Sequence, residues 1–146
     1  MQKTLILLKP DAVQKSLIGQ ILTRFEQKGY KVIGLKMMQM SEELVNEHYD
    51  FLMDKPFFPN IKSYMTSSPI VALALEGTEV IKGVRMLCGA TNPAEAGPGT
   101  IRGDFAKNID NNIIHSSDSE ETAEKELARF FKSEELFDYS CLLYTS

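Results

Sequence analysis

Short apolar runs alternate with helical patterns along the first third of the chain. Residues 4–8 form an apolar run that ends just before Pro10, where proline disfavours further strand or helix. From residue 13 to 25, apolar side chains recur every three or four positions, which predicts an amphipathic helix that Gly29 terminates. Residues 30–40 mix β-branched and other apolar side chains, as in a half-buried strand. The chain is therefore expected to begin as strand, helix, strand.

The middle of the chain predicts two helices and a central strand. Ser41, followed by two glutamates, is typical of a helix start, and this helix is expected to run to about Met53. Prolines then interrupt the chain before a second short helical pattern over residues 61–65. The nearly continuous apolar run 70–75 predicts a strand in the centre of a sheet.

The last third predicts a helix, a long loop, a short strand and a final helix. Residues 79–87 have a helical pattern, whereas 89–103 are rich in Gly, Pro, Asn and Thr and are expected to form a loop. Loops of this length inside compact domains are uncommon and tend to be functional. A strand is expected over 111–115, and Ser117 with Glu120 has the spacing of a capping box at the start of the last helix.

This order of elements predicts an α+β fold, a ferredoxin-like sandwich in which helices pack on one face of a four-stranded antiparallel sheet. A parallel doubly wound sheet is the alternative. The 146 residues are the usual length of one domain and show no internal repeat or linker, so we expect a single domain over 1–146.

Composition excludes several classes of protein. The apolar fraction of 43% is ordinary for a globular protein, and no apolar run approaches the roughly 20 residues of a membrane span. The four apolar residues 5–8 are too few for the core of a signal peptide, so we expect a cytoplasmic location and no membrane association. A net charge of −4 argues against a broad nucleic-acid surface but leaves small anionic ligands possible.

One histidine stands where an anion could bind. The chain has no Gly-rich phosphate loop, so any phosphate must be held in another way. His115 lies at the end of a predicted strand and just before a predicted helix, whose unpaired N–H groups favour anions. A neutral imidazole is also a good nucleophile near neutral pH. On spacing alone, an ordinary surface or core histidine is the more common case.

Longer stretches are more specific than this spacing. The string N-I-I-H-S-S-D-S, residues 112–119, resembles the active-site signature of nucleoside diphosphate kinases. The resemblance covers nearly the full chain and also includes residues 4–11, 24–29, 54–59, 89–93, 98–105 and 123–126. It implies transfer of the terminal phosphoryl group of a nucleoside triphosphate, mainly ATP, to a nucleoside diphosphate. It also implies a ping-pong mechanism through a phosphohistidine.

The resemblance implies roles for the groups that carry the reaction. His115 would be the nucleophile, and Glu126 would hydrogen-bond and orient its imidazole. Lys9, Arg85 and Arg102 would bind the polyphosphate, because cations stabilise the charge on the phosphoryl oxygens in the transition state.

Other positions would complete the nucleotide site. By the same resemblance, Thr91 and Asn112 would donate hydrogen bonds to a phosphate and to the sugar region, and Phe57 would stack on the base. Tyr49 would lie beside the phosphohistidine, although it could equally be a helix packing residue. Ser117 is expected to serve both as a helix cap and as a hydrogen-bond partner of the site. His48 is expected to be a solvated or capping side chain.

The resemblance also implies a cofactor and an assembly. Mg²⁺ would be held through the nucleotide phosphates, since no Asp/Glu cluster has metal-ligand spacing. The chain would form a homo-oligomer, a tetramer or a hexamer. Ser116 departs from the Gly or Ala usual after the histidine, and residues 140–146 do not resemble the family's usual tail. Two alternatives stay open: a phosphohistidine relay to a protein, and a nucleotide-binding regulatory module without turnover.

Overall fold

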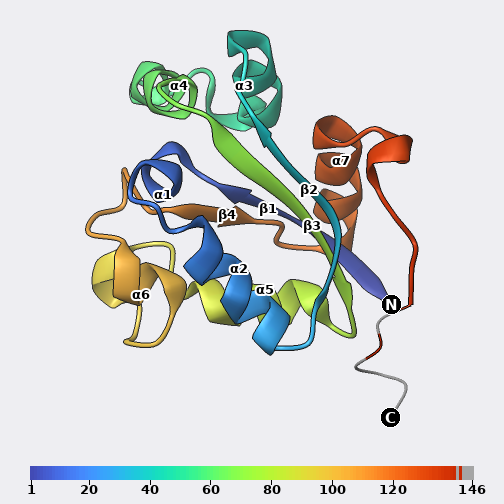
Figure 1. Ribbon diagram of the computed structural model, residues 1–146. Helices are drawn as coiled ribbons and strands as arrows, with labels where there is room; N and C mark the ends of the chain where they lie inside the picture. The colour runs from blue at the N-terminus through green and yellow to red at the C-terminus, as the bar shows by residue number, and fades with distance from the viewer. Residues whose placement is uncertain (141, 143–146) are drawn as a thin grey trace.

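Four strands form one antiparallel sheet in the order β2-β3-β1-β4 (Figure 1). The computed structural model describes residues 1–140 and 142. The strands are β1 (Gln2–Leu8), β2 (Lys31–Met38), β3 (Ile70–Gly77) and β4 (Ile114–Ser116). The pairings of β1 with β3, β1 with β4 and β2 with β3 are all antiparallel. The four-stranded antiparallel sheet is therefore confirmed, and the parallel doubly wound alternative is wrong.

Helices cover both faces of the sheet, not one face as predicted. The helices are α1 (Pro10–Gln14), α2 (Ile18–Gln27), α3 (Glu42–His48), α4 (Phe58–Thr66), α5 (Val80–Cys88), α6 (Ile101–Phe105) and α7 (Glu120–Phe130). Ile6 and Leu8 of β1 pack in a core with α1, α2, α5 and α6, whereas Leu5 and Leu7 pack with α3, α4 and α7. Because alternate residues of a strand point to opposite faces, a central strand that is apolar throughout needs cover on both sides.

Two predicted helices are shorter than their hydrophobic patterns suggest. The pattern over 13–25 divides into α1 and α2 at Ser16, whose φ of 59° is left-handed and ends the first helix. Periodicity missed this break because the apolar residues on both sides of it still face the same core. The helix expected to reach Met53 ends at His48 and is followed by a separate 3₁₀ turn, Asp50–Leu52.

The region after α5 contains more structure than the predicted loop. Within residues 89–103 the chain forms a 3₁₀ turn (Pro93–Glu95) and the start of α6, which Thr100 caps by accepting a hydrogen bond from the Gly103 N–H. The expected strand over 111–115 is limited to β4. The Ser117 capping box is also wrong, because Ser119 caps α7 instead, accepting from the Thr122 N–H at 3.1 Å.

The ends of the sheet and chain complete the fold. A last 3₁₀ turn (Ser133–Glu135) leads into a segment that runs beside β2, where the Phe137 N–H donates to the Ile33 carbonyl at 2.9 Å. Most of the unusual ending lies outside the described residues, at 141 and 143–146. None of the helices in the described part of the chain has both the length and the apolar character needed to cross a bilayer.

Candidate active site

A pocket of about 500 Å³ opens between the end of β4, the helices α3 and α7, and the region from α5 to α6. Its wall includes eight of the ten residues that the sequence suggested for a site. These are Lys9, Tyr49, Arg85, Thr91, Arg102, Asn112, His115 and Glu126. Side chains from distant parts of the chain therefore meet in one place.

His115 is held rigidly but stays accessible. It pairs in register with Leu7 of the buried strand β1, and 23% of its side chain is exposed. Its Nε2 lies 3.0 Å from Oε1 of Glu126, and that oxygen also accepts from the Ser117 hydroxyl at 2.7 Å. An ionised carboxylate only accepts, so the imidazole proton sits on Nε2 and Nδ1 keeps its lone pair.

A chain of hydrogen bonds joins Lys9 to the loop after α5. Lys9 Nζ donates to Oδ1 of Asn112 at 2.7 Å, and Nδ2 of Asn112 donates to the Thr91 carbonyl at 3.1 Å. Because the amide of Asn112 is used at both ends, its orientation is fixed. The ammonium group of Lys9 is therefore held at a defined point of the pocket wall.

The backbone just before His115 is strained and is held by Asp11. Ile113 has a φ of 76°, a left-handed conformation that β-branched residues rarely adopt. Its N–H donates to Oδ2 of Asp11 at 3.1 Å, and the Tyr64 hydroxyl donates to the other carboxylate oxygen. Asp11 thus ties α1, α4 and the entry to β4 together. Asp11 was not among the residues predicted for the site.

Two arginines project from α5 and α6. Arg85 Nη1 lies 3.4 Å from the Ser116 carbonyl. Arg102 donates from Nη1 to the Gly89 carbonyl at 2.9 Å and from Nη2 to the Ile114 carbonyl at 2.7 Å. The Nε of Arg102 is buried and has no partner among the described residues. A buried donor of this kind needs an acceptor, and an anion in the pocket would supply one.

Burial and neighbouring charges shift the pKa values of the site. Burial, with a smaller effect of Arg102, lowers the pKa of Lys9 from 10.5 to about 8. Burial alone would raise the pKa of Glu126, but His115 and Ser117 reverse this and lower it, so the carboxylate is ionised at neutral pH. Burial raises the pKa of Tyr49, which therefore stays a neutral phenol.

The comparisons with known proteins agree with this geometry. A family model described as nucleoside diphosphate kinase matches residues 2–136. The chain is 53% identical over 139 residues to nucleoside diphosphate kinase A of Homo sapiens, covering 95% of this chain and 91% of the relative. It is 52% identical to the nucleoside diphosphate kinase of Desulforamulus reducens, covering 95% and 93%. The chain belongs to the nucleoside diphosphate kinase family.

Solved structures of the family have the same fold. The nucleoside diphosphate kinase of Halobacterium salinarum, solved in complex with CDP, superposes with a TM-score of 0.96 at 44% identity, covering 99% of this chain and 96% of that one. A family protein of Babesia bovis gives 0.95 at 42% identity, covering 98% and 97%. The chain is a phosphotransferase that moves a phosphoryl group from a nucleoside triphosphate to a nucleoside diphosphate.

Two of the ten suggested residues of this nucleoside diphosphate kinase do not line the pocket. Ser117 is fully buried behind it and acts on Glu126. Phe57 is 47% exposed at the start of α4 and is not part of the pocket wall. Phe51, which the sequence analysis did not select, does line the pocket and is 69% exposed.

His48 is not the solvated or capping side chain that was expected. It is 4% exposed, and its ring centroid lies 4.9 Å from that of His115. Arg129, which the sequence analysis also missed, lines the same pocket and contacts His48. One signal was available: Glu126 and Arg129 are three residues apart on α7 and so share a helix face.

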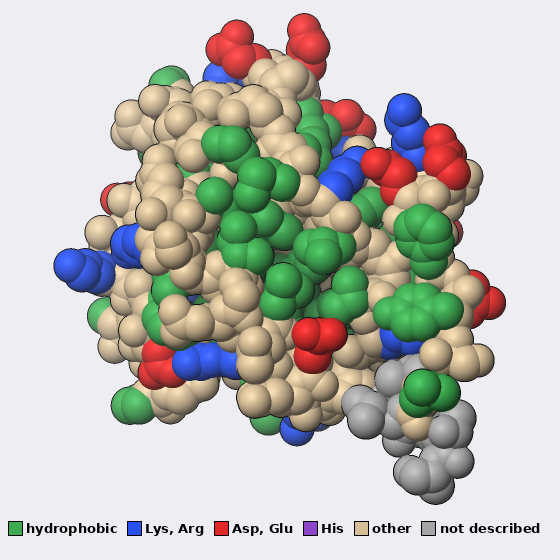
Figure 2. Space-filling view, in the orientation of Figure 1, with side chains coloured by type: hydrophobic (Ala, Val, Ile, Leu, Met, Phe, Trp, Pro, Cys, Tyr) green, Lys and Arg blue, Asp and Glu red, His purple; other side chains and the backbone are tan. Residues whose placement is uncertain are grey.

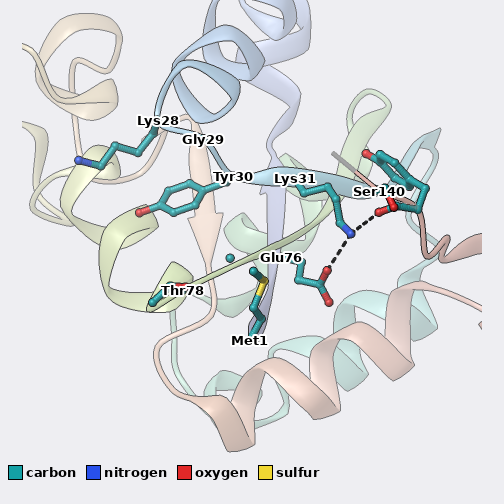
Figure 3. Close-up of a pocket in the computed structure, with 10 residues that line it drawn as sticks. Met1, Lys28, Gly29, Tyr30, Lys31, Glu76, Thr78 and Ser140 are labelled. Carbon is teal, nitrogen blue, oxygen red and sulfur yellow. Dashed lines mark hydrogen bonds and ion pairs between the residues drawn. The ribbon is translucent and has the colours of Figure 1, made fainter. Parts of the chain in front are cut away.

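A second hollow, of about 630 Å³, lies away from His115 between the end of α2, β2 and residues 139–140 (Figure 3). Nζ of Lys31 lies 3.1 Å from Oε1 of Glu76 and donates to the Tyr139 carbonyl at 2.6 Å. Figure 3 shows Lys31 and Glu76 pointing toward each other. Lys31 is thus engaged on two sides, and no imidazole lines this hollow. The residues predicted for the site line the pocket around His115 and not this hollow.

Proposed function

We propose that the chain transfers phosphate by a ping-pong mechanism in which His115 is the nucleophile. The observation that carries this proposal is the bond between Nε2 of His115 and the ionised Glu126, in a pocket that Lys9, Arg85 and Arg102 also line. That bond leaves Nδ1 with a free lone pair, in a ring that is 23% exposed.

The two half-reactions balance without an external acid or base. Nδ1 forms a bond to the terminal phosphorus of the triphosphate while the bond to the bridging oxygen breaks, and the diphosphate leaves with that electron pair. A terminal oxygen of a second diphosphate then attacks the phosphohistidine, and the electron pair returns to Nδ1. The imidazole proton stays on Nε2 throughout, where Glu126 stabilises the positive ring.

Lys9, Arg85 and Arg102 would neutralise the phosphate oxygens. Phosphoryl transfer has a loose transition state with charge spread over the peripheral oxygens, so fixed cations contribute more than covalent chemistry does. The unpartnered Nε of Arg102 supports its role, because two of its other donors are already used by carbonyl groups. Lys9 supplies a point charge held by Asn112.

Mg²⁺ would be bound through the nucleotide phosphates. Among the described residues, the one group of at least three possible ligands is His48, His115 and Glu126, whose two nitrogens suit Mg²⁺ poorly. The protein therefore fits a metal that arrives with its nucleotide and keeps water as its other ligands. When bound, Mg²⁺ would offset negative charge on the phosphates.

The remaining residues would bind the sugar and the base. Thr91 and Asn112 line the pocket and would donate to a phosphate and to the sugar region, while Tyr49 would pack beside the phosphohistidine. Phe57 would stack on the base from outside the pocket. Aromatic stacking uses a face that every base has, so purine and pyrimidine nucleotides would both be accepted. The relative from Halobacterium salinarum, solved with CDP, supports this breadth.

We further propose that the chain acts as a single domain over 1–146 and forms a homo-oligomer, a tetramer or a hexamer, in the cytoplasm. Figure 2 shows apolar side chains gathered on the face along which β2 runs. On this edge strand Leu35 and Met37 are 54% and 58% exposed. Exposed apolar residues on an edge strand support contact with a second copy of the chain.

The His115→Ala variant tests the assignment of the nucleophile. We expect phosphoryl transfer from ATP to GDP to be lost, while the affinity for ADP, measured by calorimetry, changes little because the cations remain. His48→Ala is the control. It removes the other imidazole of the chain but keeps His115, so this variant should still form a phosphoprotein. Undiminished transfer by His115→Ala would show that another residue carries the phosphoryl group.

A further inference from the structure

His48 is a buried titratable group that the mechanism above does not use. It ends α3, and its ring makes edge-to-face contacts with Tyr49, His115 and Phe130 at centroid distances of 4.7 to 5.1 Å. Its Nδ1 lies 4.0 Å from Oε2 of Glu126, the carboxylate that orients His115. Two imidazoles therefore lie within reach of one carboxylate.

Arg129 contacts this histidine from the facing helix. Its Nη1 lies 2.9 Å from Nδ1 of His48, and its Nε lies 3.5 Å from Oε1 of Glu47. A guanidinium group has only donors and stays protonated, so Nδ1 of His48 must accept. The proton of the neutral His48 ring is then on Nε2.

The tautomer of His48 decides whether His48 can donate a hydrogen bond to Glu126, the partner of His115. With its lone pair on Nδ1, His48 has no proton to offer the carboxylate 4.0 Å away. With the proton on Nδ1, His48 would donate to Oε2 of Glu126 and draw the carboxylate away from His115, which is bonded to Oε1. We propose that Arg129 is a positioning residue that fixes the Nε2–H tautomer of His48 and thereby reserves Glu126 for His115. The inference deepens the proposed function and rests on His115 being the nucleophile.

The charges around His48 act in the same direction. His48 faces His115 from β4, Glu126 and Arg129 from α7, and Lys9 from the end of β1. Burial first, and then His115, Arg129 and Lys9, lower its pKa to about 3 against the opposing effect of Glu126. Removing the charge of Arg129 would take away one of the smaller effects that lower this pKa. A protonated His48 would pair with Glu126.

Four variants test this role. Arg129→Leu removes the donor and keeps an apolar stem on α7. Glu47→Gln is the matched control. It removes the ion pair between Arg129 and the exposed Glu47, and it leaves the bond between Arg129 and His48 intact. His48→Phe keeps an aromatic ring in the core but has no ring nitrogen to protonate. The double variant Arg129→Leu/His48→Phe completes a double-mutant cycle.

The first readout is the tautomer of His48, observed by nitrogen NMR of the imidazoles in the nucleotide-free protein. Wild type and Glu47→Gln should show His48 with the proton on Nε2, and Arg129→Leu should show a mixture with the Nδ1–H form. This readout does not require His115 to be phosphorylated. An unchanged Nε2–H tautomer in Arg129→Leu would overturn the inference while leaving the proposed function intact.

The second readout is the rate at which ATP phosphorylates the protein, measured from pH 5.5 to 8. Arg129→Leu should lower this rate about tenfold at pH 7, as expected from losing one charge-assisted hydrogen bond. Glu47→Gln should follow the wild-type profile. In the His48→Phe background, Arg129→Leu should cost little more. Additive losses in the double variant would show that Arg129 serves only to join the helices. A wild-type protein that ATP never phosphorylates would instead contradict the proposed function.

Discussion

Arg102 joins two parts of the fold and is also proposed to bind the phosphates. Its two terminal nitrogens hold the carbonyl groups of Gly89 and Ile114, so the region after α5 and the strand β4 are joined by one guanidinium. Its buried Nε has no hydrogen-bond partner among the described residues. Burial lowers the pKa of Arg102, but an arginine remains charged at any pH at which the protein is folded.

Replacing Arg102 with Ala should lower kcat/KM by about two orders of magnitude. The reason is the loss of roughly 3 kcal/mol of transition-state stabilisation from one fixed charged donor. Steady-state kinetics with ATP and GDP measure the effect. Arg24→Ala is the matched control, because Arg24 pairs with Asp104 outside the pocket. An unchanged rate in Arg102→Ala would remove Arg102 from the reaction.

The charge of Lys9 should give a pH dependence on the alkaline side. In the free enzyme its pKa is lowered to about 8, so the ammonium form that binds phosphate is lost as the pH rises through that value. The value of kcat/KM for ATP, which reports the free enzyme, should therefore fall between about pH 7.5 and 9. Lys9→Arg stays charged and should flatten this limb. A limb of the same slope in both proteins would mean that Lys9 does not cause it.

Among single residues, the sequence predicted the groups that line the pocket better than the groups that support them. His115, Lys9 and Arg102 stand in strings specific enough to mark them, whereas Arg85 lies outside those strings and was marked by its position in the family pattern. His48 and Arg129 meet between helices that are distant in the chain, and the one local signal was the three-residue spacing of Glu126 and Arg129 on α7. Arg129 is also a charged residue on a helix. Such residues are usually exposed to solvent, so its residue type did not mark it as part of a site.

Among the elements, the short strand β4 depends on its neighbours more than on its own length. It has three residues, and the residue before it is in a left-handed conformation. Asp11 of α1 and Tyr64 of α4 hold that entry, as the carboxylate accepts from both the Ile113 N–H and the Tyr64 hydroxyl. The position of His115 is therefore set by helices on both faces of the sheet.

Asp11→Ala should lower the free energy of unfolding by about 3 kcal/mol. The change leaves the Ile113 N–H and the Tyr64 hydroxyl without their acceptor in a buried place, and each orphaned group costs about 1–3 kcal/mol. Urea unfolding at fixed protein concentration measures it. Asp110→Ala, at an exposed position, should change the midpoint little. Equal midpoints for both variants would contradict the supporting role of Asp11.

The hydrophobic pattern predicted the order of the helices and strands, but it did not predict the residues at which they begin and end. Apolar periodicity placed the strands and most helices, since burial dominates there. The breaks at Ser16 and Ile113 depend on single left-handed residues, which periodicity does not record. α6 was hidden because a Gly- and Pro-rich stretch is typical of loops, whereas Thr100 caps a short helix within it.

For the whole molecule, the homo-oligomer proposed above can be tested at the edge strand β2. Leu35 and Met37 are two residues apart on β2, so they lie on the same face of the strand. Leu35→Glu should lower the molar mass measured by light scattering toward that of one chain, 16.4 kDa, because a buried unpaired charge opposes association. Leu35→Met keeps an apolar side chain and should leave the assembly intact. If Leu35→Glu retained the wild-type mass, the contact would lie elsewhere.

The central claim is that the phosphoryl group rests on His115 between two nucleotides. The most direct measurement is a two-step transfer with ATP labelled in its terminal phosphate. The protein is freed of nucleotide after the first step and then mixed with unlabelled GDP. The account predicts label on the protein after the first step, absent from His115→Ala, and label in GTP after the second. A protein that never carries label, yet makes labelled GTP when ATP and GDP are present together, would contradict the account.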